Sequence, residues 1–274
     1  MILILSASST PSLFHMLGFL CRLEDEGRLR DVNKIIGIGL ASLIAVYMSL
    51  KLSIRRVLLE MLSFNFNNYS LDIDSDRMRS IFISFTMKRM EGMVGDSTLS
   101  STLIDNGIIL SLPHHDNGCE VLDSITSPST RIIDALDAAI DSNTNMCIMD
   151  SYPYQLTISS IPSSSDSSLS SSSSSSNSMS SLSSCISSTS SCISSASTYI
   201  SSNAIGIYVE SQDKRSYVNF IKTVDAYRSG VHYHLTHTPN KENTFKLSTD
   251  YTAKLIVEGF HRDVKEAKRG LSYY

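Results

Sequence analysis

The segment Gly37-Ile38-Gly39-Leu40-Ala41 has the residue types and spacing that point most directly to chemistry. A β-branched run, KIIGIG, leads into it and an apolar run follows it. Small residues at the first, third and fifth positions permit a very sharp turn from a strand into a helix. In the form Gly-x-Ser-x-Gly, such a turn is a nucleophile elbow, which presents a reactive Ser on a strained backbone. Here the central residue is Gly39, which has no atom that can attack a carbonyl carbon.

The same segment has two other interpretations. A dinucleotide-binding loop would read Gly-x-Gly-x-x-Gly, but Ser42 stands where the third Gly belongs and no suitable acidic residue follows. Ser42 is also a candidate nucleophile in its own right. Because the helix should carry Ser42 away from the tip of the turn, we expect its role to be structural.

Two groups of residues have types that bind metals, namely His114-His115-Asp116 and the set His232, His234 and His237. Adjacent side chains of an extended segment point to opposite sides, which argues against the first group. Alternate residues of a strand share a face, but the second group has no evident acidic or Cys partner. We therefore expect no metal and no other cofactor.

Alternating strands and helices must position the turn. The strand-like runs are MILILSA, KIIGIG and AIGIYVE. Helices are expected behind a turn at Ser8 to Ser12, directly behind the Gly-rich turn, behind Ser127-Pro128 as N-cap and first residue, and from Ser248 or Thr249 onward. This order predicts an α/β fold with a central, largely parallel sheet.

Composition limits the class of protein. The chain has 274 residues and a net charge of −4, which argues against a nucleic-acid partner because such proteins usually carry a basic patch. Five Cys without a Cys-x-x-Cys pair suit a reducing compartment better than a disulfide framework.

The chain divides into three parts by composition. Residues 163–202 contain 26 Ser and a single charged residue, Asp166, so they are expected to form a disordered insertion. Residues 1–162 and 203–274 then form the two halves of one domain.

No membrane-spanning or secretory segment is expected. The longest apolar run, residues 35–50, is shorter than the roughly 20 residues that cross a bilayer, and it reads as a strand followed by a core helix. The first residues lack the basic region of a signal peptide. An intracellular protein, cytoplasmic or peripheral to a membrane, is the expectation.

The Gly-rich turn and what surrounds it resemble the patatin-like phospholipases, a family of lipid acyl hydrolases. Gly-x-Gly-x-Ala-Ser-Leu-Ile-Ala is similar to the family's Gly-x-Ser-x-Gly-Ser-Leu-Ile-Ala. The similarity extends along nearly the whole chain except the Ser-rich stretch, through LSASSTPSLFHMLGFLCRLEDEG, SLIAVYMSLKLSIRRVLLEML, SPSTRIIDALDAAIDSN, AIGIYVE and FKLSTDYTAKLIVEGF. The resemblance implies a three-layer patatin-like fold.

The resemblance also implies a Ser–Asp dyad and a Gly-rich oxyanion turn, and this chain departs from each of them. Gly39 occupies the nucleophile position, and the oxyanion turn is Gly-free, at Ala7, Ser8, Ser9 and Thr10. When Pro162 is placed on the family's Pro, Tyr154 falls at the Asp position.

Two aspartates are weaker substitutes for the missing base. Asp150 lies four residues from Tyr154, so it would need a shift in register. Asp105-Asn106-Gly107 imitates the family's Asp-Gly turn but precedes the Ala-Leu helix, which is the wrong chain order.

Loss of three parts together predicts a pseudoenzyme that acts as a lipid-binding or regulatory module. Its expected partner is a lipid or membrane surface, or an active patatin-like relative. The alternative is a residual lipid acyl ester hydrolase, of phospholipase A type, that uses a non-standard nucleophile.

Overall fold

A computed structural model describes residues 1–68, 75–115, 119–141, 200–209, 220, 224, 227–235 and 248–262. The elements, in chain order, are β1 (Ile2–Ala7), α1 (Thr10–Asp25), β2 (Lys34–Gly39), α2 (Ala41–Ser49), α3 (Ile54–Leu62), the 3-10 turn η1 (Phe66–Asn68), α4 (Ser75–Val94), α5 (Leu99–Asn106), β3 (Ile109–His115), β4 (Cys119–Asp123), α6 (Ile132–Asp141), β5 (Ile200–Val209), β6 (Tyr227–Leu235) and α9 (Thr249–His261). The predicted elements around the Gly-rich turn are present.

The strands form one six-stranded sheet in the order β4-β3-β2-β1-β5-β6. Every neighbouring pair is parallel except β3 and β4, which are antiparallel. The predicted α/β fold with a central, mostly parallel sheet is therefore confirmed. The central strand β1 is flanked by β2 on one side and by β5 on the other, so the chain changes direction across the sheet at β1.

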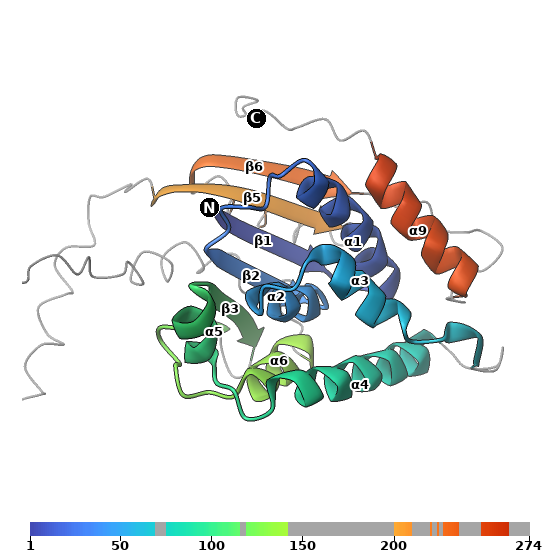
Figure 1. Cartoon of the computed structure of the whole chain (residues 1–274), viewed down its shortest axis with the longest axis horizontal. Coiled ribbons are helices and arrows are strands. Elements are labelled where there is room, and N and C mark those ends of the chain that lie inside the picture. Colours follow the sequence, from blue (N-terminus) through green and yellow to red (C-terminus); the bar gives the residue numbers. More distant parts are fainter. Residues whose placement is uncertain are drawn as a thin grey trace, which may run out of the picture.

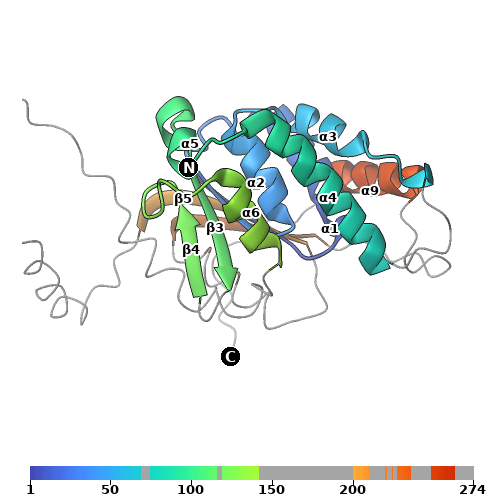
Figure 2. The ribbon, with the colours of Figure 1, turned by 90° about the horizontal axis from the view of Figure 1, so that it is seen from below.

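Alternation along each strand divides the core between the two faces of the sheet. Leu3, Leu5 and Ala7 pack into one cluster with the helices, whereas Ile2 and Ile4 pack into a second cluster on the opposite face. Helices α1 to α4 lie together on the first face (Figures 1 and 2). The second cluster includes Ile36, Ile38, Ala204, Tyr208, Phe220 and Val224.

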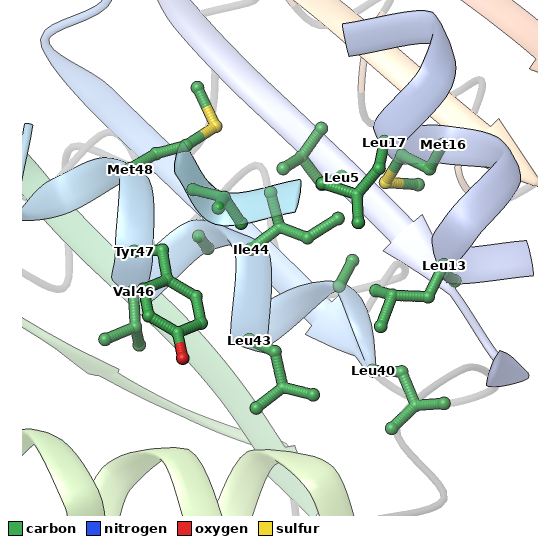
Figure 3. Packing of buried hydrophobic residues seen from close by; sticks show 14 of the residues in the cluster. Leu5, Leu13, Met16, Leu17, Leu40, Leu43, Ile44, Val46, Tyr47 and Met48 are labelled. Carbon is green, nitrogen blue, oxygen red and sulfur yellow. The ribbon is translucent and has the colours of Figure 1, made fainter. Parts of the chain in front are cut away.

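Helix α2 is the centre of the helical layer. All of its residues are buried, as expected for a run that is apolar on every side. Figure 3 shows Leu43 and Ile44 of α2 beside Leu13 and Leu17 of α1, with Leu5 of β1 nearby. The elbow segment is thus the start of a helix that is enclosed by the core.

Two helices begin at other residues than the sequence predicts. Helix α1 begins at Thr10, inside the expected turn, because Ser9 caps it and Pro11 is tolerated in a first helical turn. Helix α6 begins at Ile132, so Ser127 and Pro128 are not its N-terminus. The carbonyls of Pro128 and Thr130 accept instead the N–H groups of Ser100 and Leu99, at 3.1 and 2.8 Å, which fixes this loop against α5.

The Ser-rich segment lies almost entirely outside the described residues. Strand β5 begins at Ile200, within the expected range 163–202, and it pairs with both β1 and β6. Across the described ranges, no helix combines the length and the apolar character needed to cross a membrane.

Candidate functional site

The turn between β2 and α2 is as sharp as a nucleophile elbow requires. Strand β2 ends at Gly39, Leu40 is the N-cap, and α2 begins at Ala41. Gly39 has φ of 61°, in the left-handed region that L side chains rarely adopt. The N–H of Leu40 donates to the carbonyl of Ala7 at 2.9 Å, so the turn is tied to the end of β1.

Gly37 allows the strand and the helix to approach closely. A Cβ atom on Gly37 would lie 2.7 Å from the Cβ of Ala45 and 2.7 Å from the Cα of Ser42. Neither neighbour is a flexible side-chain end, so the position requires a residue without a side chain. The two glycines therefore serve different purposes: Gly37 provides space, and Gly39 provides the backbone conformation.

Ser42 lies beneath the turn. Its side chain is fully buried, and its Oγ donates a hydrogen bond to the carbonyl oxygen of Gly37 at 3.0 Å. This bond crosses from the first turn of α2 back to β2. A hydroxyl directed to that carbonyl is not presented at the tip of the elbow.

The residues at the oxyanion position run from the end of β1 into the first residue of α1. Ala7 is the last residue of β1 and is paired in register with Gly39. The Oγ of Ser9 accepts the N–H of Ser12 at 3.3 Å and forms a 2.7 Å hydrogen bond with the Oγ of Ser12. Ser8 is half-buried, and Thr10, the first residue of α1, is buried. The Ser9 hydroxyl is thus used to cap a helix.

Two helices begin side by side at this edge of the sheet. Because β1 and β2 are parallel neighbours, α1 and α2 both start at their carboxyl ends. The change of direction at β1 places this edge where open α/β sheets generally bind ligands. No side chain caps the first turn of α2, where the N–H of Leu43 donates to the carbonyl of Leu40 at 3.1 Å.

The structure separates Asp105 from the elbow. Asp105 is exposed in the last turn of α5, just before Gly107, whose φ of 65° ends the helix. Strand β3 follows and begins at Ile109, which pairs with Lys34, the first residue of β2. Asp105 therefore lies at the amino edge of the sheet and Gly39 at the carboxyl edge. Asp150 and Tyr154 lie outside the described residues.

The two histidine groups do not form a metal site within the residues that the structure describes. His114 is nearly buried, with Nε2 3.5 Å from Oε2 of Glu120. His232 and His234 lie on alternate positions of β6, as expected, and the ring of His234 lies 5.7 Å from that of Tyr208. Asp116 and His237 are outside the described residues, and within the described ranges no three His, Cys, Asp or Glu residues could hold a metal ion.

A buried ion-pair network was not predicted from the sequence. Glu60 of α3, with its side chain 6% exposed, accepts from Arg89 of α4 at 3.0 Å and lies 2.7 Å from Arg56. The hydrogen bond from Arg89 holds the pKa of Glu60 below its ordinary value. Burial, with a smaller contribution from Glu60, raises the pKa of Tyr47 to about 12. Within this network, the i,i+4 spacing of Arg56 and Glu60 is the signal that the sequence carries.

Fold and site together define an α/β protein with a strand–turn–helix elbow whose tip is a glycine. No family model matches this chain, and no curated protein matches it. The solved structure of the type III effector protein ExoU is similar, with a TM-score of 0.40 and 12% sequence identity. That alignment covers 94% of this chain and 51% of the ExoU chain, so this chain spans about half of that protein's length. A likeness of this size supports no conclusion about activity.

Proposed function

We propose that this chain is a patatin-like protein without Ser–Asp chemistry, and that it acts as a lipid-binding or regulatory module. The observation that carries the proposal is Gly39, which has the left-handed backbone of an elbow tip and no side chain. Loss of a nucleophile from a catalytic unit lowers rates on the order of 10⁴–10⁶-fold. The patatin-like assignment itself rests on the sequence resemblance.

The degenerate oxyanion turn supports the same proposal. An oxyanion site needs backbone N–H groups that approach the substrate closely. In this chain the corresponding turn is short, Ser9 caps α1, and Pro11 has no N–H to donate. The nucleophile position and the oxyanion position are therefore both occupied by residues with a local structural role.

The surroundings of the elbow favour an apolar ligand. Leu13, Leu40 and Leu43 lie next to the turn (Figure 3). All three side chains are fully buried in the core, so an apolar ligand would reach them only where this packing opens. A fatty acyl chain with a polar head matches this chemistry, and an active patatin-like relative is the proposed partner of a regulatory module.

Covalent labelling with a fluorophosphonate probe tests the absence of chemistry. We expect no labelling of the unmodified protein and labelling of Gly39→Ser, because the new hydroxyl would stand at the tip of the elbow. Labelling of the unmodified protein that Ser42→Ala removes would support the residual hydrolase instead and refute this proposal.

Fluorescence titration with cis-parinaric acid tests ligand binding. We expect saturable binding that oleate displaces. Failure to bind the fatty acid, together with failure of the purified protein to capture an active patatin-like hydrolase, would refute the proposed module.

A further inference from the structure

The outer sides of α3 and α4 carry exposed apolar residues next to arginines. Leu59 is 62% exposed and Met93 is 44% exposed, and they are two of the four large hydrophobic side chains that stand out in the described ranges. The α3–α4 surface is defined here by Arg55, Arg56, Leu59, Arg89 and Met93. Both helices lie on the helical side of the sheet, away from the strands (Figures 1 and 2).

Helical spacing makes these residues neighbours within each helix. Arg55 and Arg56 precede Leu59 by four and three positions on α3, and Arg89 precedes Met93 by four positions on α4. Residues at such spacing lie on the same face of a helix. Each exposed apolar side chain therefore has an arginine beside it.

Glu60 joins the two helices into one surface. Its carboxylate lies 2.7 Å from Arg56 on the same helix and accepts a 3.0 Å hydrogen bond from Nε of Arg89 on α4. Arg56 of α3 and Arg89 of α4 are thus held together by a carboxylate that they share.

The arginines of this surface are more exposed than the carboxylates with which they pair. The Glu60 side chain is 6% exposed, whereas those of Arg55, Arg56 and Arg89 are 69%, 61% and 43% exposed. Arg55 pairs with Asp25 at 2.9 Å, and Asp25 itself is 39% exposed. A ligand that approaches the surface therefore meets guanidinium groups and apolar side chains, with the Glu60 carboxylate below them.

We propose that the α3–α4 surface docks onto an anionic lipid bilayer. Leu59 and Met93 would enter the headgroup region, and the arginines would pair with lipid phosphates, which a guanidinium recognises through paired hydrogen bonds. A bilayer is favoured over an acidic protein because its interface accepts apolar side chains and phosphate partners at the same depth. This inference rests on the proposed lipid-binding function and names where the protein meets the lipid.

Co-sedimentation of the full chain with vesicles tests the inference. We expect binding to phosphatidylcholine vesicles that contain phosphatidylserine and little binding to phosphatidylcholine alone. The double variant Leu59→Ser/Met93→Ser should weaken binding roughly tenfold or more, because two apolar side chains would no longer be transferred from water into the bilayer. Arg55→Gln should weaken it by roughly fivefold.

The matched control is Ile104→Ser/Val257→Ser, which removes the other two exposed side chains, at 78% and 56% exposure, from α5 and α9. This control should bind as the unmodified protein does. All variants are compared by thermal melting, so that unfolding is separated from loss of docking.

Four results would overturn the inference: no vesicle binding, binding that ignores phosphatidylserine, equal loss in the control, or binding that survives the double variant. If poly-glutamate binds and the double variant removes that binding while vesicles do not bind, the surface serves an acidic protein. Vesicle binding through α3 and α4 does not depend on Gly39. The docking inference and the proposed fatty-acid site can therefore be refuted separately.

Discussion

The Oγ of Ser42 and the carbonyl oxygen of Gly37 are joined by a 3.0 Å hydrogen bond that fixes α2 to β2 beneath the elbow. Ser42 is fully buried, and a Cβ on Gly37 would lie 2.7 Å from the Cα of Ser42. Ser42 carries the best remaining candidate hydroxyl near the turn, and this hydroxyl therefore supports the geometry of the turn.

Ser42→Ala should lower the free energy of unfolding by about 1 kcal/mol, because one buried hydrogen bond is lost. Ser49→Ala is the matched control, since Ser49 is also fully buried and its Oγ donates to the carbonyl of Val46 at 2.7 Å, at the other end of α2. Urea denaturation should give similar losses for both. A Ser42→Ala protein that is as stable as the original would contradict the assigned role.

The two elbow glycines should respond differently to alanine. Gly39→Ala should cost about 1 kcal/mol, because alanine is strained in the left-handed conformation. Gly37→Ala should cost about 3 kcal/mol, because the added Cβ meets Ala45 and the backbone of Ser42. Urea denaturation of the two variants measures the difference, and the reverse order would show that the turn is packed differently.

The sharp turn was predictable because its requirements are local. A strand of β-branched residues, three small residues at alternate positions and an apolar run leave few other conformations for residues 34–49. The α/β class followed from the same alternation. The start of α6 was not predictable from local sequence. The carbonyls of Pro128 and Thr130, which precede it, accept hydrogen bonds from α5, and this contact joins segments that are distant in sequence.

The Glu60 network illustrates the same limit within the candidate surface. Arg89 is 29 positions from Glu60, and only the packing of α4 against α3 brings them together. The role of Ser9 as cap was hidden for a different reason: several adjacent hydroxyl residues at Ser8 to Ser12 offered equally good caps, and the backbone chose one of them.

Helices α1 and α9 cross at two glycines, and this contact should be sensitive to any added atom. A Cβ on Gly18 would lie 2.0 Å from the carbonyl oxygen of Ile256, and a Cβ on Gly259 would lie 2.1 Å from that of His15. Backbone atoms cannot move aside cheaply, so Gly18→Ala and Gly259→Ala should each cost about 3 kcal/mol.

Gly92→Ala is the control for the helix crossing. Gly92 lies in α4 with nothing within 4 Å of its added Cβ, so alanine should stabilise the protein by about 0.5–1 kcal/mol through its helix propensity. Thermal melting of the three variants checks both signs. Equal effects at all three positions would mean that α1 and α9 are farther apart than described.

The Glu60 network predicts a loss of stability in acid. The pKa of Glu60 is lowered in the folded state, first by the hydrogen bond from Arg89, so this carboxylate stabilises the fold above its unfolded pKa. That stabilisation is lost as the pH falls through the folded pKa.

Because Arg56 and Arg89 are partly exposed, Glu60→Gln should cost only about 1–2 kcal/mol at neutral pH. Urea denaturation at a series of pH values from 7 downward should show the stabilities of the variant and the original converging in acid. Glu258→Gln, which removes an exposed partner 3.8 Å from Lys254, should leave the pH dependence unchanged. A constant difference between Glu60→Gln and the original across the acid range would mean that the carboxylate charge does not stabilise the junction of α3 and α4.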